Sequence, residues 1–185
     1  MAYLFKPVIK SSKLPLESFK FLVRYLEEQV STANSKKDIT QVSKYITTNS
    51  TLSAEEWHIL NIAHYYLEDA GLKGDISKSF IEIWRYRLFG DKIESALPKH
   101  RDSYGTLFGP VNTVIFYLRK DKTIKGGDLE IYRNILLSWN PIAKYECSAG
   151  NVLVFEGSLV HKVETLKGTG IRDCIVVQMR CPMIY

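Results

Sequence analysis

Two histidines and one aspartate are the side chains of this sequence whose types and spacing best suit metal chemistry. His100 and Asp102 are separated by one residue, so an extended chain places both side chains on the same face. His161 ends the strand-like run Gly150–His161 further along the chain. Two imidazoles and one carboxylate make up the facial triad that holds non-haem Fe(II) and leaves coordination positions open for substrate and oxygen. His-x-Asp alone is a weak signal, so this hypothesis needs a second feature.

Arg172 is that second feature. It follows His161 by eleven residues, beyond the turn-forming segment Gly168-Thr169-Gly170. We expect the chain to turn there and to return on an adjacent antiparallel strand, which would bring the guanidinium deep beside the metal. A buried guanidinium is unfavourable unless an anion pairs with it, and its planar fork fits a carboxylate. The alternative is an ordinary arginine at the surface of a strand.

The first part of the chain has the hydrophobic spacing of amphipathic helices. Apolar residues recur at helical intervals over Pro15–Val30 and again over Ser53–Ala70. The second segment opens with Ser53-Ala-Glu-Glu56, a capping box. Between these helices, a short helix from Asp38 to Ile46 is a further expectation.

After Gly74 the pattern changes to short alternating or β-branched runs separated by glycine-containing turns. Helices followed by many short strands predict an α+β chain with a mainly β core, a jelly-roll or cupin-like barrel buttressed by N-terminal helices. We expect one domain over residues 1–185, with helical support in 1–72 and the barrel in 75–185. The predicted strands are 81–88, 113–118, 128–132, 151–155 and 173–179.

Composition excludes several classes of protein. With 185 residues, 45% hydrophobic and 24% charged, the chain is globular and not disordered. Its net charge of +5 is spread along the sequence, which does not favour a nucleic-acid partner. Cys147, Cys174 and Cys181 lack metal-binding spacing and are read as reduced thiols. No segment approaches the about 20 apolar residues that span a bilayer, so we expect a soluble cytoplasmic protein without a signal peptide or a membrane partner.

Five motifs follow one another along the chain: His100-x-Asp102, Gly126-Gly127-Asp-Leu129, Gly150-x-x-Leu-Val-Phe155, His161 and Gly170-x-Arg172. Taken together, these motifs resemble the prolyl-hydroxylase type of Fe(II)/2-oxoglutarate-dependent dioxygenases. The resemblance covers roughly residues 80 to 180, and it is specific as a combination although each part is weak. It implies a double-stranded β-helix, a distorted jelly roll, with iron at one mouth of the barrel.

The resemblance also implies a role for individual residues. His100, Asp102 and His161 would be the iron ligands, and Arg172 would pair with the distal carboxylate of 2-oxoglutarate. Tyr117 matches a family tyrosine whose hydroxyl binds the same carboxylate, and its alternative is a core aromatic residue. The apolar wall around the cosubstrate would be formed by Leu129, Val163 and Val176.

Two positions depart from the family pattern. A tyrosine often precedes the first iron-ligating histidine by about ten residues, whereas Gly90 lies there in this chain. We put Tyr86 forward as its substitute. Many relatives have a tryptophan six residues after the basic residue, whereas this chain has Gln178, which predicts a more polar wall on the substrate side.

The implied activity is hydroxylation of an unactivated C–H bond. Fe(II) would be the cofactor, 2-oxoglutarate and O2 would be consumed, and succinate and CO2 would be released. Ascorbate is a candidate stimulant. The first expected substrate is a prolyl or other side chain of a protein or peptide. The alternatives are a free amino acid or other small molecule, a nucleic acid for demethylation, a non-catalytic jelly-roll binding module and a zinc hydrolase. Loops 89–99 and 133–146, the latter with Trp139 and Tyr145, are expected to set specificity.

Overall fold

The computed structural model describes residues 8–32, 39–45, 52–72, 79–90, 97–102, 111–132 and 140–180. These residues form two helices and ten strands. In chain order they are β1 Ile9–Lys13, α1 Leu16–Thr32, β2 Ile39–Tyr45, α2 Ala54–Asp69, β3 Phe80–Phe89, β4 Leu97–His100, β5 Val111–Lys120, β6 Leu129–Tyr132, β7 Ala143–Tyr145, β8 Asn151–Glu156, β9 Val160–Val163 and β10 Ile171–Arg180.

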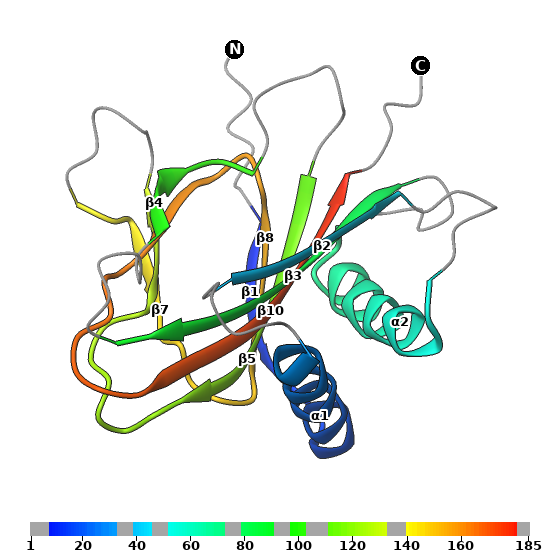
Figure 1. Ribbon diagram of the computed structural model, residues 1–185. Helices are drawn as coiled ribbons and strands as arrows, with labels where there is room; N and C mark the ends of the chain where they lie inside the picture. The colour runs from blue at the N-terminus through cyan, green and yellow to red at the C-terminus, as the bar shows by residue number, and fades with distance from the viewer. Residues whose placement is uncertain are drawn as a thin grey trace, which may run out of the picture.

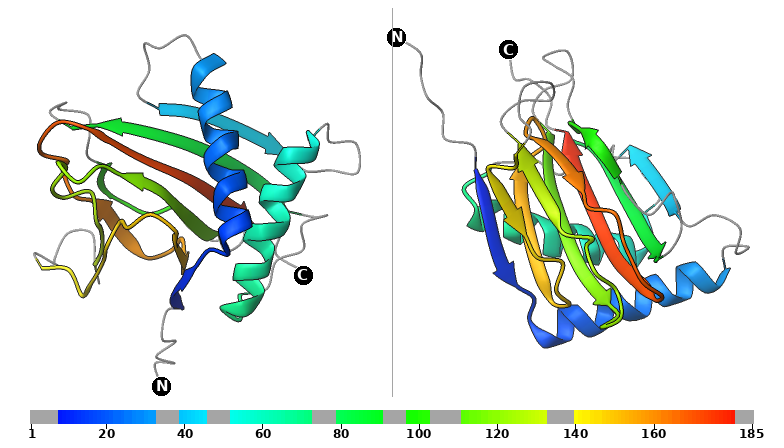
Figure 2. Two further views of the ribbon diagram at one scale, coloured as in Figure 1. Left: turned by 90° about the horizontal axis from the view of Figure 1, so that it is seen from below. Right: turned by 90° about the vertical axis from the view of Figure 1, so that its left-hand side faces the viewer.

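The strands form two antiparallel sheets that face each other. The larger sheet has the order β1-β8-β5-β10-β3-β2, and the smaller has the order β4-β9-β6-β7. Helices α1 and α2 cover one face of the larger sheet, and the smaller sheet lies on its opposite side (Figures 1 and 2). This arrangement confirms the predicted class, a mainly β jelly-roll core supported by helices from the N-terminal part of the chain.

Strand β5 shows how the sequence builds two hydrophobic cores. Val114, Phe116 and Leu118 point to the helices and join their apolar side chains in one core. Ile115 and Tyr117, on the other face, belong to the core between the two sheets. Because both faces of the central strand are covered, its residues are buried from Val111 to Leu118, which explains the near-continuous apolar run in the sequence.

Both long helices occur where the hydrophobic spacing predicts them. Helix α2 begins at the predicted capping box: the Ser53 side chain accepts a hydrogen bond from the Glu56 backbone N–H at 3.2 Å, and the Glu56 carboxylate accepts one from the Ser53 N–H at 2.9 Å. Glu56 also lies 3.5 Å from buried Arg85 of β3, so the same residue ties the helix to the sheet. Among the residues that the structure describes, no helix combines the length and apolar character required to cross a membrane.

The expected short helix over Asp38–Ile46 is wrong, because Ile39–Tyr45 is strand β2. It pairs with β3 at one edge of the larger sheet. The segment contains β-branched Ile39, Thr40 and Val42, which favour extended backbone, and the exposed edge of β3 supplies its hydrogen-bond partners. The N-terminal part is also not purely helical, since β1 pairs with β8 at the opposite edge.

Two expectations about the strands near His161 are also wrong. The run Gly150–His161 is not one strand: it divides at residues 157–159 into β8 of the larger sheet and β9 of the smaller one. Strand β10, which carries Arg172, does not pair with β9 but lies between β5 and β3 in the larger sheet. His161 and Arg172 therefore approach the same space from facing sheets, and not from neighbouring strands.

Candidate functional site

The structure brings His100, Asp102 and His161 together. His100 ends β4 and lies opposite His161 of β9 in the strand register, while Asp102 follows two residues after His100. One ligand atom from each residue lies within 4.8 Å of those of the other two. Each histidine Nε2 is 3.6 Å from Asp102 Oδ1. This geometry suits three protein ligands on one side of a metal ion.

Asp102 is held in place by its backbone and its side chain. Its N–H donates a 2.9 Å hydrogen bond to the carbonyl of Gly157, and its Oδ2 accepts a 2.6 Å hydrogen bond from the Thr113 hydroxyl. The contact to Thr113 joins the site to the larger sheet, whereas both histidines come from the smaller one. Neither Thr113 nor Gly157 was predicted from the sequence as a site residue, although Thr113 shares the strand parity of Tyr117.

The two histidines are oriented by backbone carbonyls. His100 Nδ1 lies 2.7 Å from the carbonyl of Pro98, and His161 Nδ1 lies 3.0 Å from that of Leu159. When Nδ1 carries the proton and donates it to these carbonyls, each Nε2 presents a lone pair to the site. This is the tautomer that a metal ligand requires.

The protonation states also suit a divalent cation. Burial opposes ionisation of Asp102, yet the nearby His100 and His161 rings and the hydrogen bond from Thr113 hold its pKa below the ordinary value. Burial lowers the pKa of His161, while the Asp102 carboxylate 3.6 Å away raises the pKa of His100. Asp102 and His161 are thus held in the forms that bind a metal ion, whereas at His100 the metal ion competes with a proton.

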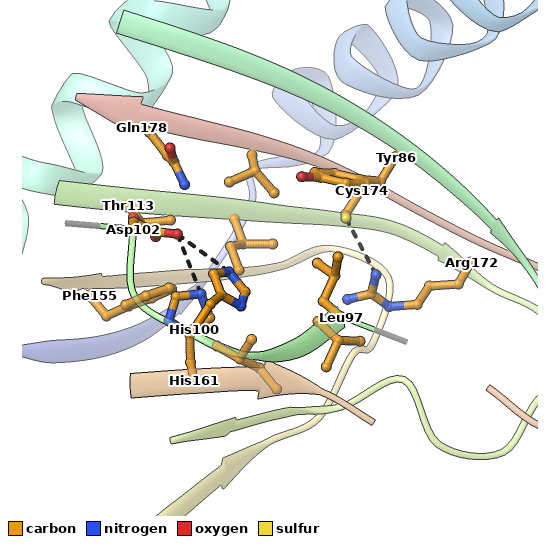
Figure 3. Close-up of a pocket in the computed structure, with 14 residues that line it drawn as sticks. Tyr86, Leu97, His100, Asp102, Thr113, Phe155, His161, Arg172, Cys174 and Gln178 are labelled. Carbon is orange, nitrogen blue, oxygen red and sulfur yellow. Dashed lines mark hydrogen bonds and ion pairs between the residues drawn. The ribbon is translucent and has the colours of Figure 1, made fainter. Parts of the chain in front are cut away.

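The triad lines a cavity between the sheets that extends to Arg172 (Figure 3). All three predicted wall residues, Leu129, Val163 and Val176, contribute to its lining, and so does Tyr86 of β3. Burial raises the pKa of the Tyr86 phenol, which therefore stays protonated. Tyr117 is fully buried behind Arg172 and is not among the lining residues in the described part of the chain.

Arg172 is a buried cation without an anionic partner among the described residues. Its side chain is 2% exposed. Its Nε donates to the Cys147 sulfur at 3.0 Å, one of its terminal nitrogens lies 3.5 Å from the Cys174 sulfur, and the guanidinium lies 5.4 Å from the centre of the Tyr117 ring. Burial raises the pKa of Cys174 to about 11, so that thiol is neutral and leaves the guanidinium charge uncompensated.

Tyr117 adds a second unsatisfied group at the same end. Its hydroxyl is buried and has no hydrogen-bond partner within the described residues. Burial raises the pKa of this phenol, so it remains a donor. A buried cation next to a buried hydroxyl donor fits an anionic ligand such as a carboxylate, since either group left unpaired is unfavourable.

Two glycines, of which Gly127 belongs to a sequence motif, permit close packing at this site. Gly127 has a φ of 77°, and a Cβ there would lie 2.4 Å from Leu166 and 3.0 Å from the Arg172 Cδ atom. A Cβ on Gly157 would lie 2.9 Å from the Asp102 Cβ and 3.1 Å from Val111. Gly127 thus leaves room for the arginine stem, and Gly157 leaves room for the metal-side aspartate.

Replacing Gly157 with alanine is therefore expected to displace Asp102. Because changes around metal ligands typically weaken metal affinity about 10- to 100-fold, we expect a loss of Mn(II) or Fe(II) affinity in this range. Isothermal titration with Mn(II) measures it. The neighbouring Ser158 is exposed, so Ser158→Ala is the matched control and should bind as the wild type does. Equal affinity in Gly157→Ala would show that Asp102 has room to move.

The predicted specificity loops lie largely outside the described residues, which omit 91–96 and 133–139 and with them Trp139. Of the remainder, Leu97 lines the cavity. Tyr145 lies on β7 and packs against the core between the sheets. Cys147 and Cys174 are free cysteines, as the sequence predicts, and the structure shows that both are buried, while Cys181 is outside the described residues.

No protein-family model matches the chain, and no curated protein sequence matches it either. Solved structures do. An oxidoreductase of the 2OG-Fe(II) oxygenase family from Burkholderia pseudomallei aligns with a TM-score of 0.63 at 15% identity, covering 92% of this chain and 84% of that one. A viral collagen prolyl hydroxylase from Paramecium Bursaria Chlorella virus-1, solved with 2-oxoglutarate, aligns with a TM-score of 0.61 at 12% identity, covering 95% and 97%.

A third similar structure is a prolyl hydroxylase from Trichoplax adhaerens in complex with a peptide fragment of hypoxia inducible factor. It aligns with a TM-score of 0.61 at 15% identity and covers 94% of this chain and 83% of that one. The alignments extend over nearly the whole chain, including its N-terminal helices. The chain therefore has the jelly-roll fold that is found in solved prolyl hydroxylases and other 2OG-Fe(II) oxygenases.

Proposed function

We propose that the protein is a single-domain Fe(II)- and 2-oxoglutarate-dependent dioxygenase that hydroxylates an unactivated C–H bond. The observation that carries this proposal is the shared cavity of the triad and Arg172. A three-ligand metal site at one end and an unpaired buried cation at the other suit a ligand that both chelates a metal and carries a distant carboxylate. The fold, shared with oxygenases that use this cosubstrate, supports the proposal.

Each residue then has a defined task. His100, Asp102 and His161 would hold Fe(II), and the Arg172 guanidinium would pair with the distal carboxylate of 2-oxoglutarate. The unpaired hydroxyl of Tyr117 supports its assignment to the same carboxylate.

The remaining assigned residues shape the space between the two ends. Leu129, Val163 and Val176 would form apolar walls that exclude water from the cosubstrate, and Tyr86 would contact it from β3. When bound, iron, 2-oxoglutarate and O2 together supply the oxidation that converts C–H to C–OH with release of succinate and CO2. The chain itself binds, orients and desolvates the reactants.

The substrate that we favour is a side chain of a protein or peptide, with proline first. Its support is that structurally similar proteins include prolyl hydroxylases, one of them with a bound peptide. A free amino acid or other small molecule is the second candidate. A nucleic-acid substrate would require affinity that falls steeply with salt, and the diffuse charge of the chain gives no reason to expect it.

Substrate-independent turnover tests the proposal. Protein stripped of metal by a chelator and supplied with Fe(II), ascorbate, O2 and 2-oxoglutarate is expected to form succinate slowly, and the same protein with Zn(II) is expected to form none. Succinate is quantified by mass spectrometry. Absence of succinate with Fe(II), together with zinc retained through purification, would contradict the oxygenase and favour a zinc hydrolase. Binding of Fe(II) and 2-oxoglutarate without any turnover would favour a non-catalytic binding module.

A further inference from the structure

The cavity has a second polar region, at Gln178, that the proposed iron and cosubstrate residues do not use. Gln178 lines the cavity from β10 near Thr113 and Asp102, at the end of the cavity away from Arg172 (Figure 3). The two residues are six positions apart on one strand, about 20 Å at roughly 3.3 Å per residue. A ligand that joins Arg172 to the metal therefore leaves Gln178 unused at the metal end of the cavity.

Strand register places Gln178 directly beside the metal site. Its Cα partners are Thr113 on β5 and Glu82 on β3. Thr113 is the residue whose hydroxyl holds Asp102 at 2.6 Å. A cross-strand row thus runs over the inner face of the larger sheet, from Thr113 beside the metal ligands through Gln178 to Glu82 on β3.

The two neighbours of Gln178 in this row already have partners. Thr113 donates to Asp102, and Glu82 lies 3.5 Å from Arg180 in an ion pair. Gln178 itself is half-buried, and its side-chain amide forms no hydrogen bond with any residue that the structure describes. The amide atoms of Gln178 are not among the fully buried unpaired polar atoms of the described residues, so the amide is open to the cavity and is free to bind a ligand group.

The chemistry around Gln178 favours an uncharged polar ligand. A primary amide offers both a donor and an acceptor, which complement the carbonyl and N–H of a peptide group. The adjacent Glu82–Arg180 pair neutralises itself, so it offers no net charge to a phosphate or to a single charged terminus. The lining toward Arg172 is apolar at Leu97, Ile115 and Val176, which leaves Gln178 as the polar group on the substrate side.

We propose that Gln178 is a specificity-determining residue whose amide hydrogen-bonds a peptide group of the substrate next to the side chain that faces the triad. This inference rests on the proposed function and narrows its substrate to a peptide chain, in preference to a free amino acid. Gln178 selects and positions the substrate, and it takes no part in binding iron or 2-oxoglutarate.

Two sets of probes test the inference: twenty blocked peptides of the form acetyl-Gly-Xaa-Gly-amide, and the twenty free amino acids. We expect at least one peptide to stimulate succinate formation by the wild type and to gain the mass of one oxygen atom. In Gln178→Met, the KM of that peptide should rise about tenfold, since one hydrogen bond between partly buried groups is lost. The kcat, the substrate-independent succinate formation and the 2-oxoglutarate affinity should stay unchanged.

Gln178→Asn retains an amide on a shorter side chain and should recover part of the peptide affinity. Unchanged substrate-independent turnover in both variants shows that they are folded and that the metal site is intact. The inference is overturned if KM is unaffected by Gln178→Met, if free amino acids stimulate turnover and peptides do not, or if no peptide stimulates. In each of these cases, succinate formation by the wild type would still support the proposed function. Absence of succinate formation by the wild type would overturn both the proposed function and the inference about Gln178.

Discussion

Replacing Asp102 with alanine is expected to abolish succinate formation. The variant loses the carboxylate that joins the two imidazoles, each of whose Nε2 atoms lies 3.6 Å from Asp102 Oδ1. Changes in groups that merely support metal ligands typically cost about 10- to 100-fold in affinity, so removal of a ligand should cost at least about a hundredfold. Titration with Mn(II) gives the affinity, and mass spectrometry gives the succinate formed with Fe(II).

A graded control separates loss of the ligand from loss of the fold. Thr113→Val removes the 2.6 Å hydrogen bond to Asp102 but keeps the carboxylate and the shape of the β5 side chain. We expect this variant to bind metal more weakly than the wild type but more tightly than Asp102→Ala. Both variants should keep the wild-type circular dichroism spectrum. Full turnover by Asp102→Ala would show that the metal, or the chemistry, lies elsewhere.

The elements that depend on local sequence were the most predictable. Helix α2 has its apolar spacing and its capping box within one segment, and β5 contains the β-branched and aromatic run Thr113–Tyr117. Strand β2 was mistaken for a helix because its identity depends on the open edge of β3, which is distant in sequence. A local sequence pattern carries no information about pairing with a strand that is distant in the sequence.

The candidate site also has a part that the sequence could predict and a part that it could not. The pair His100 and Asp102 could be proposed from spacing, and His161 and Arg172 from order along the chain. The expectation that His161 and Arg172 lie on adjacent antiparallel strands was wrong. The chain turns at residues 157–159, so His161 lies in the smaller sheet and Arg172 in the larger one. Their roles stay predictions, but the structure does place all four around one cavity.

The surroundings of Arg172 were not predictable. Cys147 lies in the segment after β7, 25 residues before Arg172, yet its sulfur accepts from the Arg172 Nε. No spacing rule links a cysteine in a connecting segment to an arginine on a distant strand. The consequence is chemical, because neutral thiols and a phenol surround the cation and leave it available to an anion.

Replacing Arg172 with methionine is expected to weaken 2-oxoglutarate binding at least about a hundredfold. Removing one partner from a buried, charged hydrogen-bonded pair typically costs about 3–5 kcal/mol, and each 1.4 kcal/mol is about tenfold in Kd. Metal affinity should be retained, since Arg172 has no contact with the triad among its described interactions. Titration of 2-oxoglutarate into the Mn(II)-loaded protein measures the change, and succinate formation should recover as the cosubstrate concentration rises.

Thermal stability gives a second measurement of the Arg172→Met variant, in which ligand binding is lost but the Tm of the ligand-free protein is not lowered. In the ligand-free protein Arg172 is a buried cation without an anionic partner in the described part of the chain, so a methionine of similar length should not lower the Tm. Addition of 2-oxoglutarate with Mn(II) should raise the Tm of the wild type and leave that of Arg172→Met almost unchanged. Arg119→Met is the matched control, because Arg119 is 45% exposed and paired with Asp121. If 2-oxoglutarate raised the Tm of the wild type and of Arg172→Met equally, Arg172 would not be the anion site on which the proposed function depends. The remaining described residues of the cavity offer no second unpaired buried cation that could take its place.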